Sequence, residues 1–255
     1  MPGELTSGPG WTWDPSGYIA VTGNGAVVDG IVTTASIDVS GATGVVIKNS
    51  RITVSGEGWG VALRHASNVT IQDSEISGPS ATGATRLMVG IKDVYGDSSG
   101  TKVLRNNIFN TATGVQIDQG LIEANYIHAL GLTGGDHVNG TTSNGGSNQL
   151  TIRGNTIFNP HDQTDAISLF QDFGPQANRL IEKNLIAGGG YSIYAGANPG
   201  MASTATNIIV QNNRVSKLYY PDGGYYGAAT AYASGGGNIW SGNVWDDDGS
   251  LISAP

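Results

Sequence analysis

The sequence predicts an all-β fold, a parallel β-helix in which short strands coil around one long axis. Composition gives the first indication, because 40 of the 255 residues are glycine and charged residues make up only 13%. Globular domains average ~7% glycine and ~25% charged residues, so this balance directs attention to internal repeats. A motif that recurs around an asparagine then predicts the architecture.

The motif has an apolar residue, two variable positions, usually an asparagine, one variable position and a second apolar residue. Both apolar positions are apolar in all nine copies, and the middle position is asparagine in six. The copies occupy residues 27–32, 47–52, 71–76, 103–108, 122–127, 152–157, 181–186, 210–215 and 240–245. Valine and isoleucine favour half-buried strands, and asparagine tolerates the left-handed conformation of a corner. Each copy therefore predicts a strand, a corner and a second strand.

Neighbouring coils must stack, because a single coil cannot bury its own apolar face. Stacked corners would place the asparagine amides in a hydrogen-bonded ladder, as identical side chains do in stacked sheets. Successive copies begin 19–32 residues apart, which fits the coils of a parallel β-helix. A twisted β-sandwich is the alternative fold, but it would not require an asparagine at one fixed offset.

We expect one domain over residues 1–255, because no linker-like tract or charge run divides the chain. Residues 1–26 are rich in glycine and proline, and we expect them to cap the first coil, since an open solenoid end exposes core and a sheet edge. Residues 27–255 are then expected to form about nine coils.

A further strand is expected after each corner, often opened by a small residue. Alternation along this strand turns one residue of each coil outward, and neighbouring coils lie ~4.8 Å apart. Counting back from the aligned Gly140 and Ala166, Asn139 should lie beside Asp165, with His137 on the same side. The predicted outward column is Ala62, Lys92, Gln116, Thr142, Ser168, Tyr194 and Ala229.

The repeats, of which residues 148–157 are a clear example, resemble those of the right-handed parallel β-helix proteins of the pectate-lyase-like superfamily. The resemblance covers residues 20–250, approximately, and implies a right-handed coil. It also implies a polysaccharide partner, because most enzymes of that superfamily cut or epimerise polysaccharides, often acidic ones, in a groove along one sheet face. A secreted protein is expected with that function, although residues 1–4 do not resemble the start of a signal peptide.

Titratable and polar side chains gather on the predicted outward face, where a solenoid repeat does not by itself require them. The candidate catalytic residues are His137, Lys92, Tyr194, Asp165 and Asp118. The candidate substrate-binding residues are Arg64, Arg86, Asp136, Asn139, Gln116, Ser168, Phe170 and Tyr191.

Lyase chemistry on a uronic acid needs a base for the C5 proton, an acid for the leaving oxygen and a cation that neutralises the carboxylate. His137 or Lys92 would be the base and Tyr194 the acid. Arg64, Arg86 or a calcium ion would neutralise the carboxylate. The candidate calcium ligands are Asp136, Asp162 and Asp165. No motif in the sequence requires calcium or another cofactor.

Two other functions stay open. An inverting glycoside hydrolase needs two carboxylates ~6.5–9.5 Å apart, and Asp165 would pair with Asp118 or with Asp136. A non-catalytic glycan-binding or adhesive β-helix would use aromatic residues such as Trp59 as stacking surfaces.

Composition also excludes several classes of function. Twelve basic and 20 acidic residues give a net charge of −8, which argues against a nucleic-acid partner. No stretch approaches the ~20 consecutive apolar residues of a membrane span, so no membrane partner is expected. The chain has no cysteine, which excludes disulfides, thiolate metal ligands and a thiol nucleophile.

Overall fold

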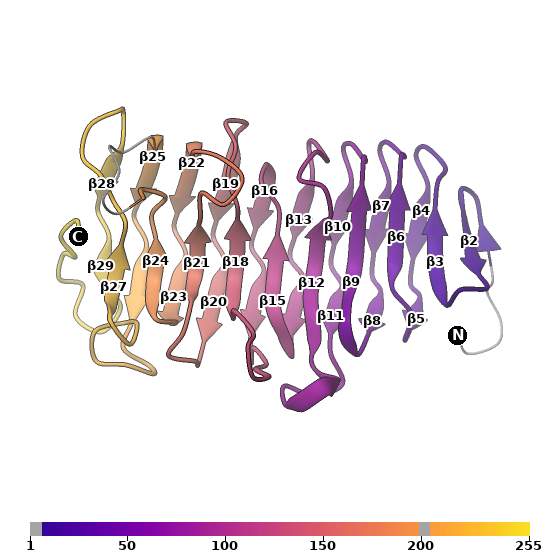
Figure 1. The fold of residues 1–255 in the computed structure, drawn as a ribbon, viewed down its shortest axis with the longest axis horizontal. Coiled ribbons are helices and arrows are strands. Elements are labelled where there is room, and N and C mark those ends of the chain that lie inside the picture. Colours follow the sequence, from indigo (N-terminus) through magenta and orange to yellow (C-terminus); the bar gives the residue numbers. More distant parts are fainter. Residues whose placement is uncertain (1–6, 199–204) are drawn as a thin grey trace.

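The chain folds as a parallel β-helix, as the repeats predict (Figure 1). A computed structural model describes residues 7–198 and 205–255. Three sheets run along the axis, and successive coils lie side by side from the N-terminus to the C-terminus (Figure 1). Within the described residues, sheet A has 11 strands and sheets B and C have nine each.

The strands follow one another through the three sheets. Sheet A contains β1 (Ser7–Gly8), β2 (Trp11–Asp14), β3 (Tyr18–Val21), β6 (Ile37–Ser40), β9 (Gly56–Arg64), β12 (Leu87–Asp93), β15 (Thr111–Gln116), β18 (Asn139–Ser143), β21 (Asp165–Leu169), β24 (Tyr191–Tyr194) and β27 (Gly227–Thr230). Sheet B contains β4 (Val27–Asp29), β7 (Val46–Lys48), β10 (Thr70–Gln72), β13 (Lys102–Leu104), β16 (Gly120–Glu123), β19 (Leu150–Arg153), β22 (Ala177–Glu182), β25 (Thr206–Gln211) and β28 (Ile239–Ser241). Sheet C contains β5 (Val32–Thr33), β8 (Arg51–Thr53), β11 (Glu75–Ser77), β14 (Asn107–Phe109), β17 (Tyr126–His128), β20 (Thr156–Asn159), β23 (Leu185–Gly188), β26 (Arg214–Ser216) and β29 (Val244–Trp245).

Helical structure is minimal in the described part of the chain. It holds one 3₁₀ turn, η1 (Gly83–Thr85), and no helix there has the length and hydrophobicity needed to cross a membrane.

The motif copies are in the predicted register in eight of nine coils. In sheet B, Ile71 pairs with Ile47 on one side and with Val103 on the other. The same register continues to the last coil, where Val210 pairs with Trp240. The two apolar positions of these copies therefore form continuous rows along the axis.

The first copy was predicted one residue too early. Val28, and not Val27, pairs with Ile47, and Thr33 rather than Val32 pairs with Ile52. The reason is Gly30, whose φ of 68° places it at the left-handed position just before the corner.

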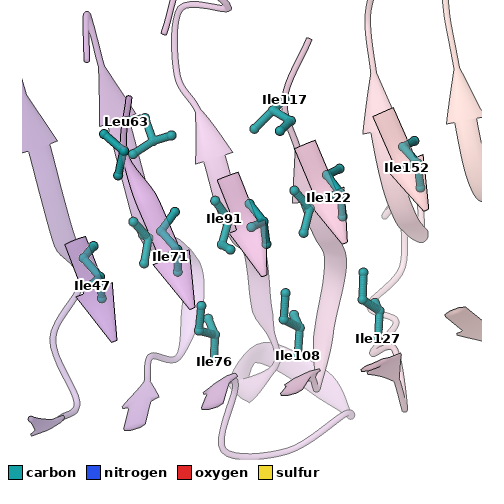
Figure 2. Packing of buried hydrophobic residues seen from close by; sticks show 14 of the residues in the cluster. Ile47, Leu63, Ile71, Ile76, Ile91, Ile108, Ile117, Ile122, Ile127 and Ile152 are labelled. Atoms are coloured by element: carbon teal, nitrogen blue, oxygen red, sulfur yellow. The ribbon is translucent and has the colours of Figure 1, made fainter. Parts of the chain in front are cut away.

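The interior is filled by rows of branched aliphatic side chains (Figure 2). Ile47, Ile71 and Ile122 form part of the row on sheet B, and Ile76 and Ile108 form part of the row on sheet C (Figure 2). These side chains are at most 1% exposed. Each coil thus buries its apolar face against the next, which is the source of stability in a stacked repeat.

The predicted asparagine ladder is present. From Asn106 onward, each ladder Nδ2 donates to the Oδ1 of the next ladder asparagine at 2.9–3.1 Å. Each Nδ2 also donates to a backbone carbonyl, for example Asn155 to Ile122 O at 3.0 Å. The ladder consists of Asn106, Asn125, Asn155, Asn184, Asn213 and Asn243, all at most 2% exposed.

The left-handed backbone of each corner lies one residue before the ladder, and not on the asparagine as expected. Ala124 (φ 56°) precedes Asn125, and Lys183 (φ 55°) precedes Asn184. The asparagine is needed for its amide, which hydrogen-bonds above and below the coil.

The two ends of the stack are closed in different ways. Strands β1, β2 and β3 pair in antiparallel fashion, and β3 then pairs in parallel with β6. The parallel stack therefore begins at Tyr18, inside the segment expected as a cap. At the other end, Leu251 forms an antiparallel bridge with Val244, and Trp240 Nε1 donates to Ile252 O at 2.8 Å.

Candidate functional site

The predicted outward column lies on the outer surface of sheet A, which we call the sheet A face. Lys92 pairs with Ala62 and Gln116, and the row continues through Thr142, Ser168 and Tyr194 on successive strands. The last position was predicted wrongly, because Tyr194 pairs with Thr230 and Ala229 pairs with the inward Ile193.

A second outward column runs beside the first. Thr113, Asn139 and Asp165 are paired on consecutive strands, which confirms the predicted neighbours Asn139 and Asp165. A glycine or alanine follows each of these residues because the space beneath is filled. A Cβ on Gly140 would lie 2.2 Å from Ile157 Cγ2 and 2.5 Å from Ala166 O.

Two adjoining hollows occupy the middle of the sheet A face. The Lys92 hollow is lined by Lys92, Tyr95, Gln116, Asp118, Asn144 and Phe173, among others. The His137 hollow is lined by Thr113, Gln116, His137, Asn139, Asn144 and Phe170, among others. Gln116 and Asn144 line both, so the two hollows adjoin on this face, and we call them together the depression.

Lys92 is half-buried at the floor of its hollow. No ion pair within the described part of the chain includes it. Burial lowers the pKa of the Lys92 ammonium, and the charges of Asp118 and Asp93 oppose that shift only in part. A larger fraction of Lys92 is therefore neutral, and able to accept a proton, than of an ordinary surface lysine.

Asp118 is held on the far wall of the Lys92 hollow. Its Oδ1 accepts hydrogen bonds from Ser143 Oγ at 3.0 Å and from the backbone N–H of Asn144 at 2.6 Å. Ser143 in turn contacts Gln176, and Gln176 Oε1 accepts from Arg179 Nε at 2.6 Å. A buried polar network thus fixes the orientation of Asp118.

Asp165 lies beneath the other end of the depression and is 4% exposed. Burial raises the pKa of its carboxyl to about 7, although the Tyr191 N–H and the Ser168 hydroxyl donate to it at 3.1 and 3.3 Å. Ser168 Oγ also lies 2.5 Å from Asn139 Oδ1. Ser168 therefore links Asp165 to Asn139, and with a pKa of about 7 Asp165 can exchange a proton near neutral pH.

Arg86 and Asp136 were predicted to bind substrate, but the structure joins them in a buried ion pair. Arg86 is 1% exposed, and its Nε and Nη2 donate to the two Asp136 oxygens at 2.7 and 2.6 Å. Glu57 binds the same guanidinium at 2.9 Å. The pair ties the segment before β12 to the segment before β18, and neither charge is free for a ligand.

The three predicted calcium ligands do not form a cluster. Asp136 uses both oxygens on Arg86, Asp165 is buried, and Asp162 is exposed. Among the described residues, no group of three or more histidine, cysteine, aspartate or glutamate side chains is placed to hold a metal ion.

Arg64 lies at the N-terminal end of the sheet A face. Its Nε donates to Asp38 Oδ2 at 2.7 Å, and its Nη1 donates to the Tyr95 hydroxyl at 3.3 Å. The guanidinium carbon is also 5.2 Å from the centroid of the Trp59 ring. Arg64 therefore stands on the ridge between the Lys92 hollow and a separate hollow around Trp59.

Tyr194, Phe170 and Tyr191 lie toward the opposite end. Phe170 and Tyr194 have ring centroids 5.1 Å apart and share a small hollow with Asp172, and the Tyr191 ring packs against Tyr226. Burial raises the pKa of Tyr194, with Asp165 and Asp172 adding to the shift. Four strand spacings, ~19 Å, separate Tyr194 from Lys92, so the two cannot act on one sugar residue.

The carboxylates proposed for hydrolysis are also poorly placed. Asp165 is in register with Thr113, so Asp118 is two strands away and five residues further along. That offset corresponds to roughly 18 Å between Cα atoms, far more than the ~6.5–9.5 Å between carboxyl groups of inverting enzymes. Asp136 is occupied by Arg86.

Several residues of the depression were not predicted, among them Tyr95, Asn144 and Asp172. Asn144 follows Thr142 by two positions, as Asp118 follows Gln116 and Phe170 follows Ser168. Extending the alternation of inward and outward residues by one more outward position would have identified Asn144. Tyr95 and Asp172 lie in loops beyond the strands, where no periodicity operates.

Comparison with known proteins identifies the fold family. A family model described as a right-handed beta helix region matches residues 21–169, more than half of the chain. The chain belongs to this right-handed beta helix family. No curated protein and no solved structure matches it. Such a fold is compatible with polysaccharide-active proteins, and the chemistry must be argued from the sheet A face.

Proposed function

We propose that this protein binds an acidic polysaccharide along the sheet A face and cleaves it by β-elimination at the Lys92 hollow, as lyases of the pectate-lyase-like superfamily do. The observation that supports the proposal is Lys92 itself. It is a half-buried lysine with a lowered pKa, set in a depression on the sheet and without an ion-pair partner among the described residues. A protein that acts on such a polymer would be expected outside the cell.

In this reaction neutral Lys92 Nζ removes the C5 proton of a uronic acid. The electron pair of the C5–H bond forms the C4–C5 double bond, and the C4–O bond breaks. Gln116 and Asn144 line the same hollow, and their amide N–H groups would hydrogen-bond the uronate carboxylate and stabilise the charge that develops beside C5.

Tyr95 takes the role of acid in place of the distant Tyr194. Its phenol lines the Lys92 hollow, and its oxygen accepts a hydrogen bond from Arg64 Nη1. Its own O–H remains available to protonate the leaving oxygen. The acid, the base and the carboxylate-binding amides then belong to one hollow.

The test is activity on a panel of uronic-acid polymers, followed by the ultraviolet absorbance of the unsaturated product. Lys92→Met should lower the rate by about 10²–10⁴-fold, the usual contribution of a general base. Lys102→Met is the matched control, because Lys102 is an exposed lysine on sheet B. No product from the wild-type protein on any polymer, or full activity of Lys92→Met, would refute the proposal.

A second candidate function, glycan binding without catalysis, is favoured by the state of the arginines. Arg64 is paired with Asp38, Arg86 with Asp136, and Arg179 donates to the carbonyls of Gly145 and Gly146. None of these three guanidinium groups is free to neutralise a uronate. Tight binding of oligosaccharides with neither unsaturated product nor new reducing ends would select this function, and new reducing ends alone would indicate hydrolysis.

A further inference from the structure

A separate hollow lies on the sheet A face, on the N-terminal side of Arg64. Small residues form its floor, including Ala20, Ser36, Gly58 and Ala62. Tyr18, Trp59 and the Asp38–Arg64 pair also line it. Small residues beside aromatic rings leave room for a flat ring in this hollow. We call this depression the Trp59 hollow.

The Trp59 hollow holds one cation and one anion in a direct ion pair, whereas Lys92 in the neighbouring hollow, which Asp93 and Asp118 also line, forms no ion pair among the described residues. Arg64 Nε and Asp38 Oδ2 are 2.7 Å apart, with the two side chains 27% and 19% exposed. The Asp38 hydrogen bond raises the pKa of Arg64, so the guanidinium stays charged. The guanidinium is further held near the rings of Trp59 and Tyr95, at 5.2 and 5.8 Å from their centroids.

We propose that the Trp59 hollow binds a neutral sugar residue, a pyranose that carries hydroxyls and no carboxylate. The Asp38 carboxylate has more lone pairs than one Arg64 hydrogen bond uses, so it can also accept from sugar hydroxyls. The Trp59 ring offers an apolar face to the C–H side of the sugar. A uronate would instead face Asp38, whose charge already cancels that of Arg64.

The spacing connects this hollow with the Lys92 hollow. Asp38, Ala62 and Lys92 are paired on three consecutive strands, so Asp38 lies two strand spacings, ~10 Å, from Lys92. One chain of sugars can cross both. This last step rests on the proposed function: the substrate is a heteropolysaccharide that places an acidic sugar at Lys92 and a neutral sugar at Trp59.

The direct test uses neutral hexasaccharides, namely cellohexaose, mannohexaose, xylohexaose and galactohexaose, with the indole N–H resonance of Trp59 as the reporter. At least one of them should shift this resonance in the wild-type protein, and Trp59→Ala should weaken its binding about tenfold or more, measured for all variants by titration calorimetry. Trp59→Phe, which keeps a ring, should lose less. Tyr126→Ala is the matched control, because Tyr126 is an exposed aromatic residue on sheet C.

A charge variant makes the test sharper. Asp38→Asn leaves Arg64 uncompensated, so it should weaken the neutral hexasaccharide and strengthen a hexamer of galacturonate or mannuronate, each by about tenfold. Lys102→Met, on the exposed surface of sheet B, should leave neutral binding at Trp59 unchanged. The proposal is overturned if no neutral hexasaccharide shifts the Trp59 resonance, or if only uronate hexamers do so in the wild-type protein. Neutral binding without any lyase product would refute the proposed function alone, and lyase activity without neutral binding would refute this inference alone.

Discussion

Two aspartates with buried side chains, Asp136 just before β18 and Asp165 at the start of β21, have opposite electrostatic environments. Burial alone would raise the pKa of Asp136, but hydrogen bonds from Arg86 and the Thr133 N–H, with the charges of Arg86 and His137, lower it. Burial raises the pKa of Asp165 to about 7, because only the uncharged Tyr191 N–H and Ser168 hydroxyl oppose it. A counter-charge therefore decides which carboxylate stays ionised.

The difference separates a structural carboxylate from one that can exchange a proton. Asp136 connects two distant segments through Arg86, and its charge is committed to that pair. Among the described residues no cation pairs with Asp165, which contacts Ser168, and Ser168 in turn contacts Asn139 at the depression on the sheet A face. Both residues look alike in the sequence, and only their partners distinguish them.

The largest expected effect comes from breaking the pair. Asp136→Asn would leave the buried Arg86 charge with Glu57 as its one carboxylate, and Glu57 is 69% exposed at its side chain. We expect the free energy of unfolding to fall by about 3–5 kcal/mol, measured by urea denaturation. Glu57→Gln is the control and should cost about 1 kcal/mol or less. A loss as small as that of the control would mean that Asp136 is not the dominant partner of Arg86.

The second prediction concerns Asp165 and pH. Its folded pKa of about 7 lies above the ordinary 3.8, so its protonated form contributes stability below pH ~4, and that contribution is lost as the pH rises to about 7. Asp165→Asn removes this dependence. Relative to the wild type, the free energy of unfolding of the variant should therefore rise by about 2–4 kcal/mol between pH 4 and 7.

Thermal denaturation across that range measures the effect. Asp162→Asn is a suitable control, because Asp162 is exposed in the segment just before β21. Parallel curves for Asp165→Asn and wild type would show that Asp165 is ionised throughout, and the contrast with Asp136 would disappear.

The coils themselves could be predicted because the same pattern of apolar residues and asparagine recurs in each of them. Ile71 aligns with Ile47 and Val103 through a two-residue alternation and a fixed asparagine offset, and the same count placed Asn139 beside Asp165. The error in the first coil has a local cause. Gly30 was taken for the corner residue, but its φ of 68° places it one position earlier, at the left-handed residue that precedes the corner.

The site could be predicted only where it lies on strands. Lys92 and Gln116 follow from the alternation, whereas Arg86 and Asp136 are 50 residues apart, outside the motif copies. Their pairing depends on loops of irregular length, which no period constrains. For the same reason Tyr95 was missed and Tyr194 was chosen as the acid, although it lies on the correct face.

The smallest expected effect tests the comparison from the cation's side. Arg179 is 1% exposed, and burial lowers its pKa to about 10, with Asp118 opposing the shift. Its Nη2 donates to Gly145 O and Gly146 O at 3.1 and 2.8 Å, so it holds the loop that walls the Lys92 hollow. Arg179→Met would remove the Arg179 donor from both carbonyls, although Gly146 O keeps the Ala177 N–H, and it would also remove a buried charge, so we expect a net loss of only about 1–2 kcal/mol. Amide hydrogen exchange should nevertheless speed up at Gly146. The control is Arg153→Met, which removes an exposed pair with Glu123 and should leave exchange at Gly146 unchanged.

A loss of unfolding free energy as large as that of Asp136→Asn would contradict the comparison. It would mean that backbone carbonyls compensate a buried charge as well as a carboxylate does, so that geometry, and not charge, would distinguish the two regions.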